Sequence, residues 1–229
     1  MSDLKFRHEV KHLITPQDRI IIRQRMNAVA SVDKNAKDGI YEIRSLYFDN
    51  IDDKALFEKI NGGSKREKFR IRYYNGDPSY MHLEKKSKID NLCNKQSAMI
   101  TENEVRMLME GDMDWMIGEE TNKRPLIREL YTKMKGQGLK PRTIVDYTRD
   151  PFTYGPGNVR VTIDYNIRTG LNVEGFLDWN CVTMPVSNSP IILEVKWDEF
   201  LPDIIRDAVQ LESRQAGAFS KYVACRCYG

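Results

Sequence analysis

Residues 68–74 read KFRIRYY, and residues 82–88 read HLEKKSK. In both stretches apolar residues alternate with charged or polar ones. Because successive side chains of a β-strand point to opposite faces, Lys68, Arg70 and Arg72 share one face. Asn75-Gly76-Asp77-Pro78 lies between the stretches and has the residues of a turn. The sequence therefore predicts a long antiparallel hairpin, Lys65–Asn75 with Tyr80–Ile89, that carries charge on one face.

The same period-two pattern occurs at Leu4–His12, with Arg7, Glu9 and Lys11 on one face, and at Val159–Asp164, with Arg160, Thr162 and Asp164 on one face. Further strands are predicted at Tyr41–Asp49, Leu92–Ile100, Arg142–Tyr154 and Ile191–Trp197. About eight strands with mostly antiparallel connections can close into a barrel and so remove their edges. We expect an α+β fold: an eight-stranded antiparallel β-barrel with peripheral helices, whose charged face lines the lumen.

Helix signals fall between the strands. Thr15 before Pro16 is typical of a helix start, and a helix of about 14 residues is expected there. Thr101 and Glu104 form a capping box for a second helix. Helical spacing of apolar residues recurs in Pro125–Lys135, so a helical insertion is expected at about 101–138. A last helix is predicted at Leu201–Arg214. The 229 residues fit one domain, 1–229.

Composition excludes several classes of protein. Lys and Arg number 36 against 33 Asp and Glu, a net charge of +3. That balance is too weak for a nucleic-acid-coating protein, and no nucleic acid is expected as partner. No apolar run is long enough to span a membrane, and the first residues, Met1–Lys5, lack the apolar region of a signal peptide. The chain is expected in the cytoplasm without direct membrane insertion. A partner protein in a membrane remains an alternative that the sequence leaves open. No nucleotide-binding glycine loop is present.

Basic residues two apart on one strand face predict an anion site. Arg70 and Arg72 are spaced by roughly 6–7 Å, near the repeat of successive phosphoryl groups. Arginine suits such a site because its planar fork donates in pairs to phosphate oxygens. A solvated strand face is an equal alternative for these two residues alone. It weakens because Lys11, Lys86, Lys95, Arg149, Arg160 and Lys221 also lie in positions compatible with a single cavity.

Acidic residues occur on the same segments: Glu9, Glu84, Asp164 and Glu194. Magnesium or manganese is usually held by one or two carboxylates plus substrate phosphates, so acids inside a basic cavity suit such a metal. Glu194 is the strongest candidate, because it interrupts the otherwise apolar strand Ile191–Trp197. A buried ion pair of Glu194 or Glu9 with a neighbouring Arg or Lys is the alternative. Both interpretations place these side chains inside.

In order along the chain, several motifs resemble those of the VTC domain, the polyphosphate polymerase domain of the vacuolar transporter chaperone complex. They are Arg7–His12, Ser45–Asp49, Phe69–Tyr74, Leu83–Lys86, Val159–Asp164, Ile192–Lys196 and Phe219–Tyr222. That family belongs to the triphosphate tunnel metalloenzymes, also called CYTH-like. The resemblance runs from about residue 5 to 223 and implies an eight-stranded tunnel in which basic residues bind a triphosphate.

Carried over position by position, the resemblance implies catalytic roles for Lys11, Arg70, Arg72, Lys86, Arg149 and Arg160. It places Lys59, Lys95, Ser220 and Lys221 on the phosphate path, and Glu194 and Glu9 on a divalent metal, manganese or magnesium. Lys59 stands where the family usually has an arginine. Arg7 replaces the first acid of the superfamily's E-x-E-x-K signature, and Glu9 corresponds to its last acid.

The activity implied is transfer of the γ-phosphate of ATP to polyphosphate, with pyrophosphate as a further acceptor. With water as acceptor, the same site would be a triphosphate hydrolase acting on an inorganic or nucleoside triphosphate. A non-catalytic module that binds polyphosphate or nucleotide is the alternative outside enzymology. An RNA-binding barrel is a poorer option, because no recognition motif is present. The sequence alone does not separate the first three.

Overall fold

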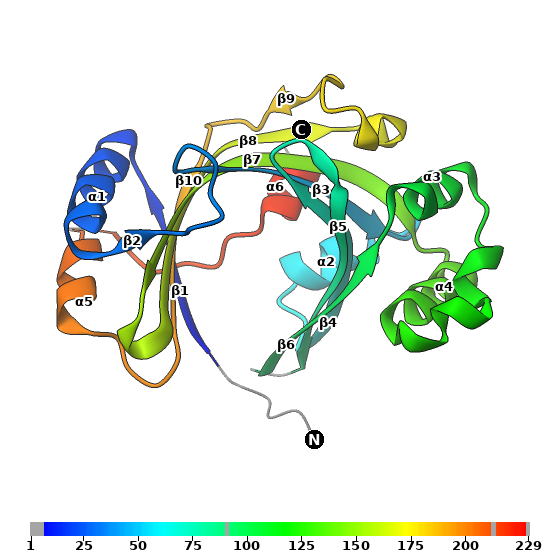
Figure 1. The fold of residues 1–229 in the computed structure, drawn as a ribbon, viewed down its shortest axis with the longest axis horizontal. Helices are drawn as coiled ribbons and strands as arrows, with labels where there is room; N and C mark the ends of the chain where they lie inside the picture. The colour runs from blue at the N-terminus through cyan, green and yellow to red at the C-terminus, as the bar shows by residue number, and fades with distance from the viewer. Residues whose placement is uncertain (1–6, 90–91, 212–213, 228–229) are drawn as a thin grey trace. The chain divides into compact units, whose positions relative to one another are not determined.

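The computed structural model describes residues 7–89, 92–211 and 214–227 of the chain. These residues form two compact units (Figure 1). Unit 1 consists of Met1–Glu42, Tyr147–Ile167 and Pro185–Lys221, and unit 2 consists of Ile43–Asp146, Arg168–Met184 and Tyr222–Gly229. Leu4, Lys5 and Phe6 of the predicted first strand lie outside the described residues. Each unit has its own hydrophobic core.

Unit 1 contains three paired strands and two helices that lie side by side (Figure 1). The strands are β1 (His8–Ile14), β10 (Ile191–Trp197) and β8 (Val159–Gly170), each antiparallel to the next. The helices are α1 (Pro16–Val29) and α5 (Asp203–Val209). The core combines apolar residues from these strands, such as Ile163 and Leu193, with Ile22, Met26 and Ile205 of the helices. The apolar face of each strand is thus buried and the charged face is directed away from the core.

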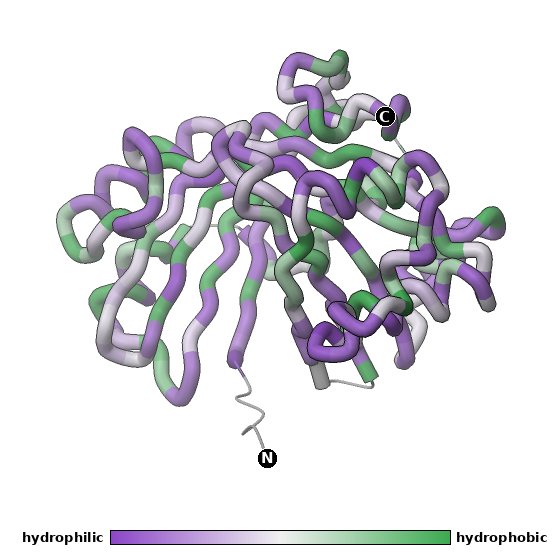
Figure 2. The backbone as a smooth tube through the Cα atoms, turned by 45° about the vertical axis from the view of Figure 1, so that its right-hand side comes forward, coloured by the Kyte–Doolittle hydropathy of each residue, from purple (hydrophilic) through white to green (hydrophobic). Residues whose placement is uncertain are grey.

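Unit 2 is built on the predicted hairpin. Its strands are β3 (Tyr41–Asp49), β4 (Lys65–Tyr74), β5 (Asp77–Ile89) and β6 (Leu92–Ile100), all antiparallel. Its helices are α2 (Lys54–Ile60), α3 (Glu102–Glu110), α4 (Pro125–Gln137) and α6 (Lys221–Cys227), with short 3-10 helices at Asp114–Ile117, Glu119–Lys123 and Val173–Leu177. Phe69, Ile71, Tyr73 and Leu83 are buried in its core. Hydrophilic and hydrophobic residues alternate along the strands (Figure 2).

The strand order is β1-β10-β8-β7-β3-β4-β5-β6, in which β7 is Lys140–Tyr154 and belongs partly to each unit. Two short strands, β2 (Ser31–Val32) and β9 (Met184–Pro185), pair with β7 and β8 and give ten strands where eight were expected. A 3-10 turn at Pro156–Asn158 joins β7 to β8. The antiparallel α+β fold is confirmed. The sheet does not close into the predicted barrel. β1 and β6 are its two end strands and do not pair with each other in the described chain.

Both end strands carry charged side chains. β1 carries Glu9 and Lys11, and β6 carries Lys95. Charged side chains on an edge strand discourage further pairing, since a neighbouring strand would have to desolvate them.

The helix starts follow the predicted capping residues. Thr15 accepts from the Asp18 amide and Asp18 accepts from the Thr15 amide, and Thr101 and Glu104 make the same reciprocal pair at α3. Both caps are confirmed. The predicted helix Leu201–Arg214 is shorter, Asp203–Val209, because Gln210 takes an extended conformation. Residues 212 and 213 lie outside the described residues. None of the described helices combines the length and the apolar character that crossing a membrane requires.

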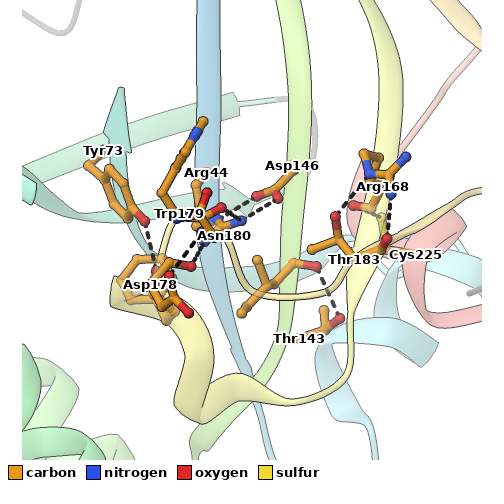
Figure 3. A network of polar contacts seen from close by, with 12 residues as sticks. Arg44, Tyr73, Thr143, Asp146, Arg168, Asp178, Trp179, Asn180, Thr183 and Cys225 are labelled. Atoms are coloured by element: carbon orange, nitrogen blue, oxygen red, sulfur yellow. Dashed lines mark hydrogen bonds and ion pairs between the residues drawn. The ribbon is translucent and has the colours of Figure 1, made fainter. Parts of the chain in front are cut away.

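A buried arginine, Arg44, connects β3 to Asp146 and to residues 178–179 of unit 2 (Figure 3). Arg44 on β3 is 2% exposed and donates to both carboxylate oxygens of Asp146, at 2.9 and 2.8 Å. It also donates to the carbonyl oxygens of Asp178 and Trp179, and its guanidinium lies 4.7 Å from the Trp179 ring centroid. Tyr73 donates to the Phe176 carbonyl in the same segment. These bonds fix residues 176–179 against the strands of unit 2.

Candidate functional site

A basic cluster lies on the charged face of unit 2. We call it the β4–β5 cluster and define it as Lys68, Arg70, Arg72, Glu84, Lys86 and Lys95. Strand register explains the grouping. Arg70 lies opposite Glu84, Lys68 lies opposite Lys86, and Lys86 lies opposite Lys95. Five cations thus accompany one carboxylate on three adjacent strands.

Glu84 holds the cations of this cluster in place. Its carboxylate accepts from Arg70 Nε at 2.7 Å and pairs with Lys95 at 2.5 Å, and Arg72 lies 3.9 Å away. Glu84 is 6% exposed. Burial raises its pKa, but Arg70, Arg72 and Lys95 lower it more strongly, so the pKa lies well below the usual value. Arg72 also donates to Ser45 at 3.0 Å. The carboxylate is therefore ionised at neutral pH and orients two guanidinium groups.

The three lysines of the cluster face one another across neighbouring strands. Like charges directly opposite destabilise a sheet, so this row is unfavourable without a counter-charge. Burial, together with Lys59, Lys86 and Arg70, lowers the pKa of Lys68 to about 8. Such a row of cations is suited to binding an anion, because its summed positive charge attracts one.

Unit 1 carries a second cluster in which acids and bases alternate. Lys11 lies opposite Glu194, and Glu9 lies opposite Lys196. Lys11 Nζ is 2.7 Å from Glu9 and 4.0 Å from Glu194, and Lys196 pairs with both carboxylates. Burial raises the pKa of Glu194, but Lys196, Lys11 and Arg149 lower it more strongly, so the pKa lies below its usual value. Burial lowers the pKa of Lys11, but the negative charges of Glu194 and Glu9 raise it more strongly, so the pKa lies above its usual value.

The unit 1 cluster also includes Asp164, its most deeply buried acid. The cluster consists of Glu9, Lys11, Arg149, Asp164, Glu194, Lys196 and Lys221. The Asp164 side chain has no exposed surface and accepts from Arg149 Nε at 2.6 Å and from a second Arg149 nitrogen at 2.9 Å. Lys221 lies 2.5 Å from the same carboxylate and 4.6 Å from the Tyr147 ring centroid. Burial raises the pKa of Asp164, but Arg149 and Lys221 lower it more, to about 2. Asp164 therefore fixes Arg149 and Lys221 on one face of unit 1.

Three predicted site residues, Arg160, Lys59 and Ser220, make few of the contacts described above. Arg160 shares a strand face with Asp164, but its side chain is 54% exposed and its guanidinium donates to Asp33 at 2.9 Å. Lys59 lies in the last turn of α2, where its charge lowers the pKa of Lys68. Ser220 directly precedes α6, and Lys221 begins that helix. The structure thus brings Arg70, Arg72, Lys86 and Lys95 together in unit 2, and Lys11, Arg149, Lys221, Glu9 and Glu194 together in unit 1.

Several residues in or beside these clusters were not among the predicted site residues: Glu84 and Asp164, which the sequence suggested only as nearby acids, and Lys68, Lys196 and Tyr47. Lys68 and Lys196 could have been included, because each is two residues from a predicted member and shares its strand face. Tyr47 on β3 lies opposite Arg70, and its hydroxyl oxygen accepts a hydrogen bond from Arg70 Nη1 at 2.8 Å. A tyrosine on a strand is usually a core residue, so sequence pattern gave no reason to select it.

The carboxylates of unit 1 fit a divalent metal only in part. No group of three or more His, Cys, Asp or Glu side chains in the described residues has a metal-binding arrangement. Glu9 and Glu194, however, lie on paired strands and contact the same two ammonium groups. Two carboxylates are what a magnesium-type ion takes from a protein when substrate phosphates and water complete its shell. These residues therefore fit a metal that arrives with a phosphate ligand.

Comparison with known proteins places the chain in a family. The VTC domain model matches residues 6–228, and the chain belongs to that family. The VTC domain is a member of the CYTH-like tunnel fold. The predicted family is therefore confirmed over nearly the whole chain.

Solved structures give only distant similarity. The PH1819 protein of Pyrococcus horikoshii OT3 is 14% identical, with a TM-score of 0.43 over 89% of this chain and 84% of that one. A proposed adenylate cyclase from Bacillus halodurans is 11% identical, with a TM-score of 0.49 over 84% of this chain and 80% of that one. No curated protein matches the sequence.

Proposed function

We propose that this VTC-domain protein is a metal-dependent polyphosphate polymerase, which transfers the γ-phosphate of ATP to a polyphosphate chain and releases ADP. The observation that carries the proposal is the β4–β5 cluster, in which five cations accompany a single carboxylate. Such an excess of ordered positive charge suits a ligand with several phosphoryl groups. Polyphosphate, pyrophosphate and ATP or another triphosphate are the ligands of this kind.

Phosphoryl transfer asks little covalent chemistry of a protein, because positioning and charge neutralisation supply most of the rate enhancement. Arg70 and Arg72 are held by Glu84 and Ser45 before any ligand arrives. Fixed donors do not have to reorganise when charge develops on the transferred group. Lys86 and Lys95 add charge beside them. In this proposal these four side chains neutralise the phosphates, and Lys11, Arg149, Arg160 and Lys221 do the same in unit 1.

The proposed metal, manganese or magnesium, would be held by Glu194 and Glu9. When bound it would neutralise charge on phosphate oxygens. The protein's own part is to keep the Glu194 carboxylate ionised. Lys11 and Lys196 do so by lowering the pKa of Glu194. Lys59 in unit 2 and Ser220 in unit 1 are each proposed to contact phosphates.

The test is incubation of the purified protein with ATP and manganese, with polyphosphate, ADP and free phosphate resolved as products. Pyrophosphate is added as a primer in a parallel reaction. We expect polymer and ADP, and loss of both in Arg70→Ala and Glu194→Gln. Arg206→Ala is the matched control, because Arg206 is 60% exposed and pairs only with neighbouring surface acids of α5.

Free phosphate without polymer would replace the proposal with a triphosphate hydrolase, since water would then be the acceptor. Binding of polyphosphate with no turnover would leave a binding module. No binding and no product with either metal would contradict the proposal altogether.

A further inference from the structure

Tyr47 is a buried tyrosine with a cationic partner. It lies on β3 and is 7% exposed. Its hydroxyl is 2.8 Å from Arg70 Nη1, and the Arg70 guanidinium carbon lies 5.7 Å from the Tyr47 ring centroid. Glu84 holds the opposite side of the same guanidinium. Arg70 is therefore held between a carboxylate from β5 and a phenol from β3.

A second tyrosine fixes the ring of Tyr47. Tyr222 of α6 stacks on it with 5.1 Å between ring centroids. The Tyr222 hydroxyl donates to Asp49 at 2.6 Å, and Asp49 also accepts from the backbone amides of Ala55 and Leu56 at the start of α2. Asp49 has no exposed surface. The Tyr47 ring thus rests on a buried support and has little freedom to move away from Arg70.

Several elements of unit 2 place cations around Tyr47, and the nearby Glu84 carboxylate is paired with two of them, Arg70 and Lys95. β4 contributes Lys68, Arg70 and Arg72, β5 contributes Lys86 and the paired Glu84, and α2 contributes Lys59 beside Lys68. α6 contributes the neutral Tyr222, with Asp49 behind it. Burial raises the pKa of Tyr47, but Arg70, Arg72 and Lys68 lower it more, to about 8.

We propose that Tyr47 is a positioning residue of the phosphate site, which holds Arg70 in place for the anion while its phenol is neutral. The inference rests on the proposed function, because it takes the β4–β5 cluster as a phosphate site. When the phenol ionises, it places a negative charge beside Arg70 and competes with the anion for that guanidinium. Tyr47 then weakens binding at alkaline pH. The site would therefore bind polyphosphate best below about pH 8.

The test compares the full-length protein with Tyr47→Phe, which keeps the ring and removes only the hydroxyl. Affinity for inorganic tripolyphosphate is measured by calorimetry at several pH values from 7 to 9.5, without metal. The ratio of the two affinities at each pH is the readout, so the ionisation of tripolyphosphate itself cancels. We expect the variant to bind about tenfold more weakly at pH 7, the order of one hydrogen bond to a charged group. At pH 9.5 the order should reverse, with the wild type binding more weakly than Tyr47→Phe, because only the wild type then carries the competing phenolate.

Tyr73→Phe is the matched control. Tyr73 is also buried on unit 2 strands and also loses one hydroxyl hydrogen bond, to the Phe176 carbonyl. Its affinity ratio should stay near one at every pH. Circular dichroism melting of each variant shows that the protein remains folded.

The outcomes separate the two proposals. If the wild type binds tripolyphosphate and the Tyr47→Phe ratio is one at pH 7, or is the same at all pH values, the inference about Tyr47 is wrong and the phosphate site stands. If the wild type does not bind tripolyphosphate, the phosphate site itself is wrong, and the role of Tyr47 is overturned with it. Turnover is not needed for either conclusion.

Discussion

Single carboxylates set the geometry of both clusters. Asp164 in unit 1 and Glu84 in unit 2 are buried, and each contacts two or more cations at short distance. A buried charge is tolerated only when partners compensate for its lost hydration. Each acid therefore serves as the fixed point around which longer, more mobile Lys and Arg side chains are ordered.

Replacement of Asp164 by Asn should be strongly destabilising. Arg149 would keep its charge with a neutral partner, and an uncompensated buried charge costs about 3–5 kcal/mol. Urea unfolding of the full chain measures the loss. Asp203→Asn is the control, because the Asp203 side chain is 79% exposed and its pair with Arg206 is a surface pair, worth at most about 1 kcal/mol. Equal losses in the two variants would contradict the assigned role of Asp164.

Asp164 also predicts a pH dependence of stability. Its pKa in the folded protein, about 2, lies below the ordinary 3.8, so the unfolded chain takes up the proton first as the pH falls. The stabilisation is complete above about pH 4 and is lost between pH 4 and pH 2. Its size is about 2 kcal/mol, from 1.36 kcal/mol for each pH unit of difference. The gap in unfolding free energy between the wild type and Asp164→Asn should therefore narrow by about 2 kcal/mol as the pH falls from about 4 to about 2, and parallel curves would refute the assignment.

At the level of the elements, local sequence signals predicted most starts and few ends. The Thr15 cap and the Thr101–Glu104 capping box were predicted because cap residues act within one turn, whereas the reciprocal bond from Asp18 at Thr15 was not predicted. The end of α5 was not predicted, because Gln210 is compatible with a helix and its extended backbone has no local signal. The two-residue strands β2 and β9 were also missed, because a period cannot be recognised over two residues.

The cap of α3 supports a direct prediction. Thr101→Ala removes the side-chain oxygen that accepts from the Glu104 amide at 3.2 Å. Loss of such a cap typically costs about 1 kcal/mol. Thermal unfolding should show a lower midpoint for this variant. Thr101→Ser, which keeps the acceptor oxygen, should stay close to the wild type, and a Ser variant as unstable as the Ala variant would show that the cap is not the cause.

For the whole molecule, the sequence predicted which strand faces are charged, but it did not predict which residue pairs with each charged side chain. Period-two alternation assigned Arg70, Arg72, Glu84 and Glu194 to one side of their strands, and the register of the structure agrees. The pairing of Arg160 with Asp33, 127 residues away, has no local signal. Nor does the contact of Tyr47 with Arg70, since it depends on which strand becomes the neighbour of β4. Long-range pairing is decided by the assembled sheet, so a pattern within one strand does not contain it.

Ligand binding should stabilise the folded chain as a whole. A ligand that binds only the native state adds about 2.7 kcal/mol at 100 times its dissociation constant. Inorganic tripolyphosphate should therefore raise the melting temperature of the wild type and have little effect on Arg70→Ala. The effect should shrink in high salt, because exposed charges are screened. A salt-independent rise shared by both proteins would point to binding elsewhere.

The Arg44 network in unit 2 has a kinetic consequence. Arg44 meets Asp146, 102 residues later, and the Asp178 carbonyl, 134 residues later. Its guanidinium must lose its hydration to enter the core, yet its partners are brought close only when loops of more than a hundred residues have closed. Contacts of such long sequence separation form late and slow the search for the native state. We therefore expect the docking of residues 176–179 on β3 to be among the last events when unit 2 folds, and a refolding chain to pass through a stage in which this arginine is still in water.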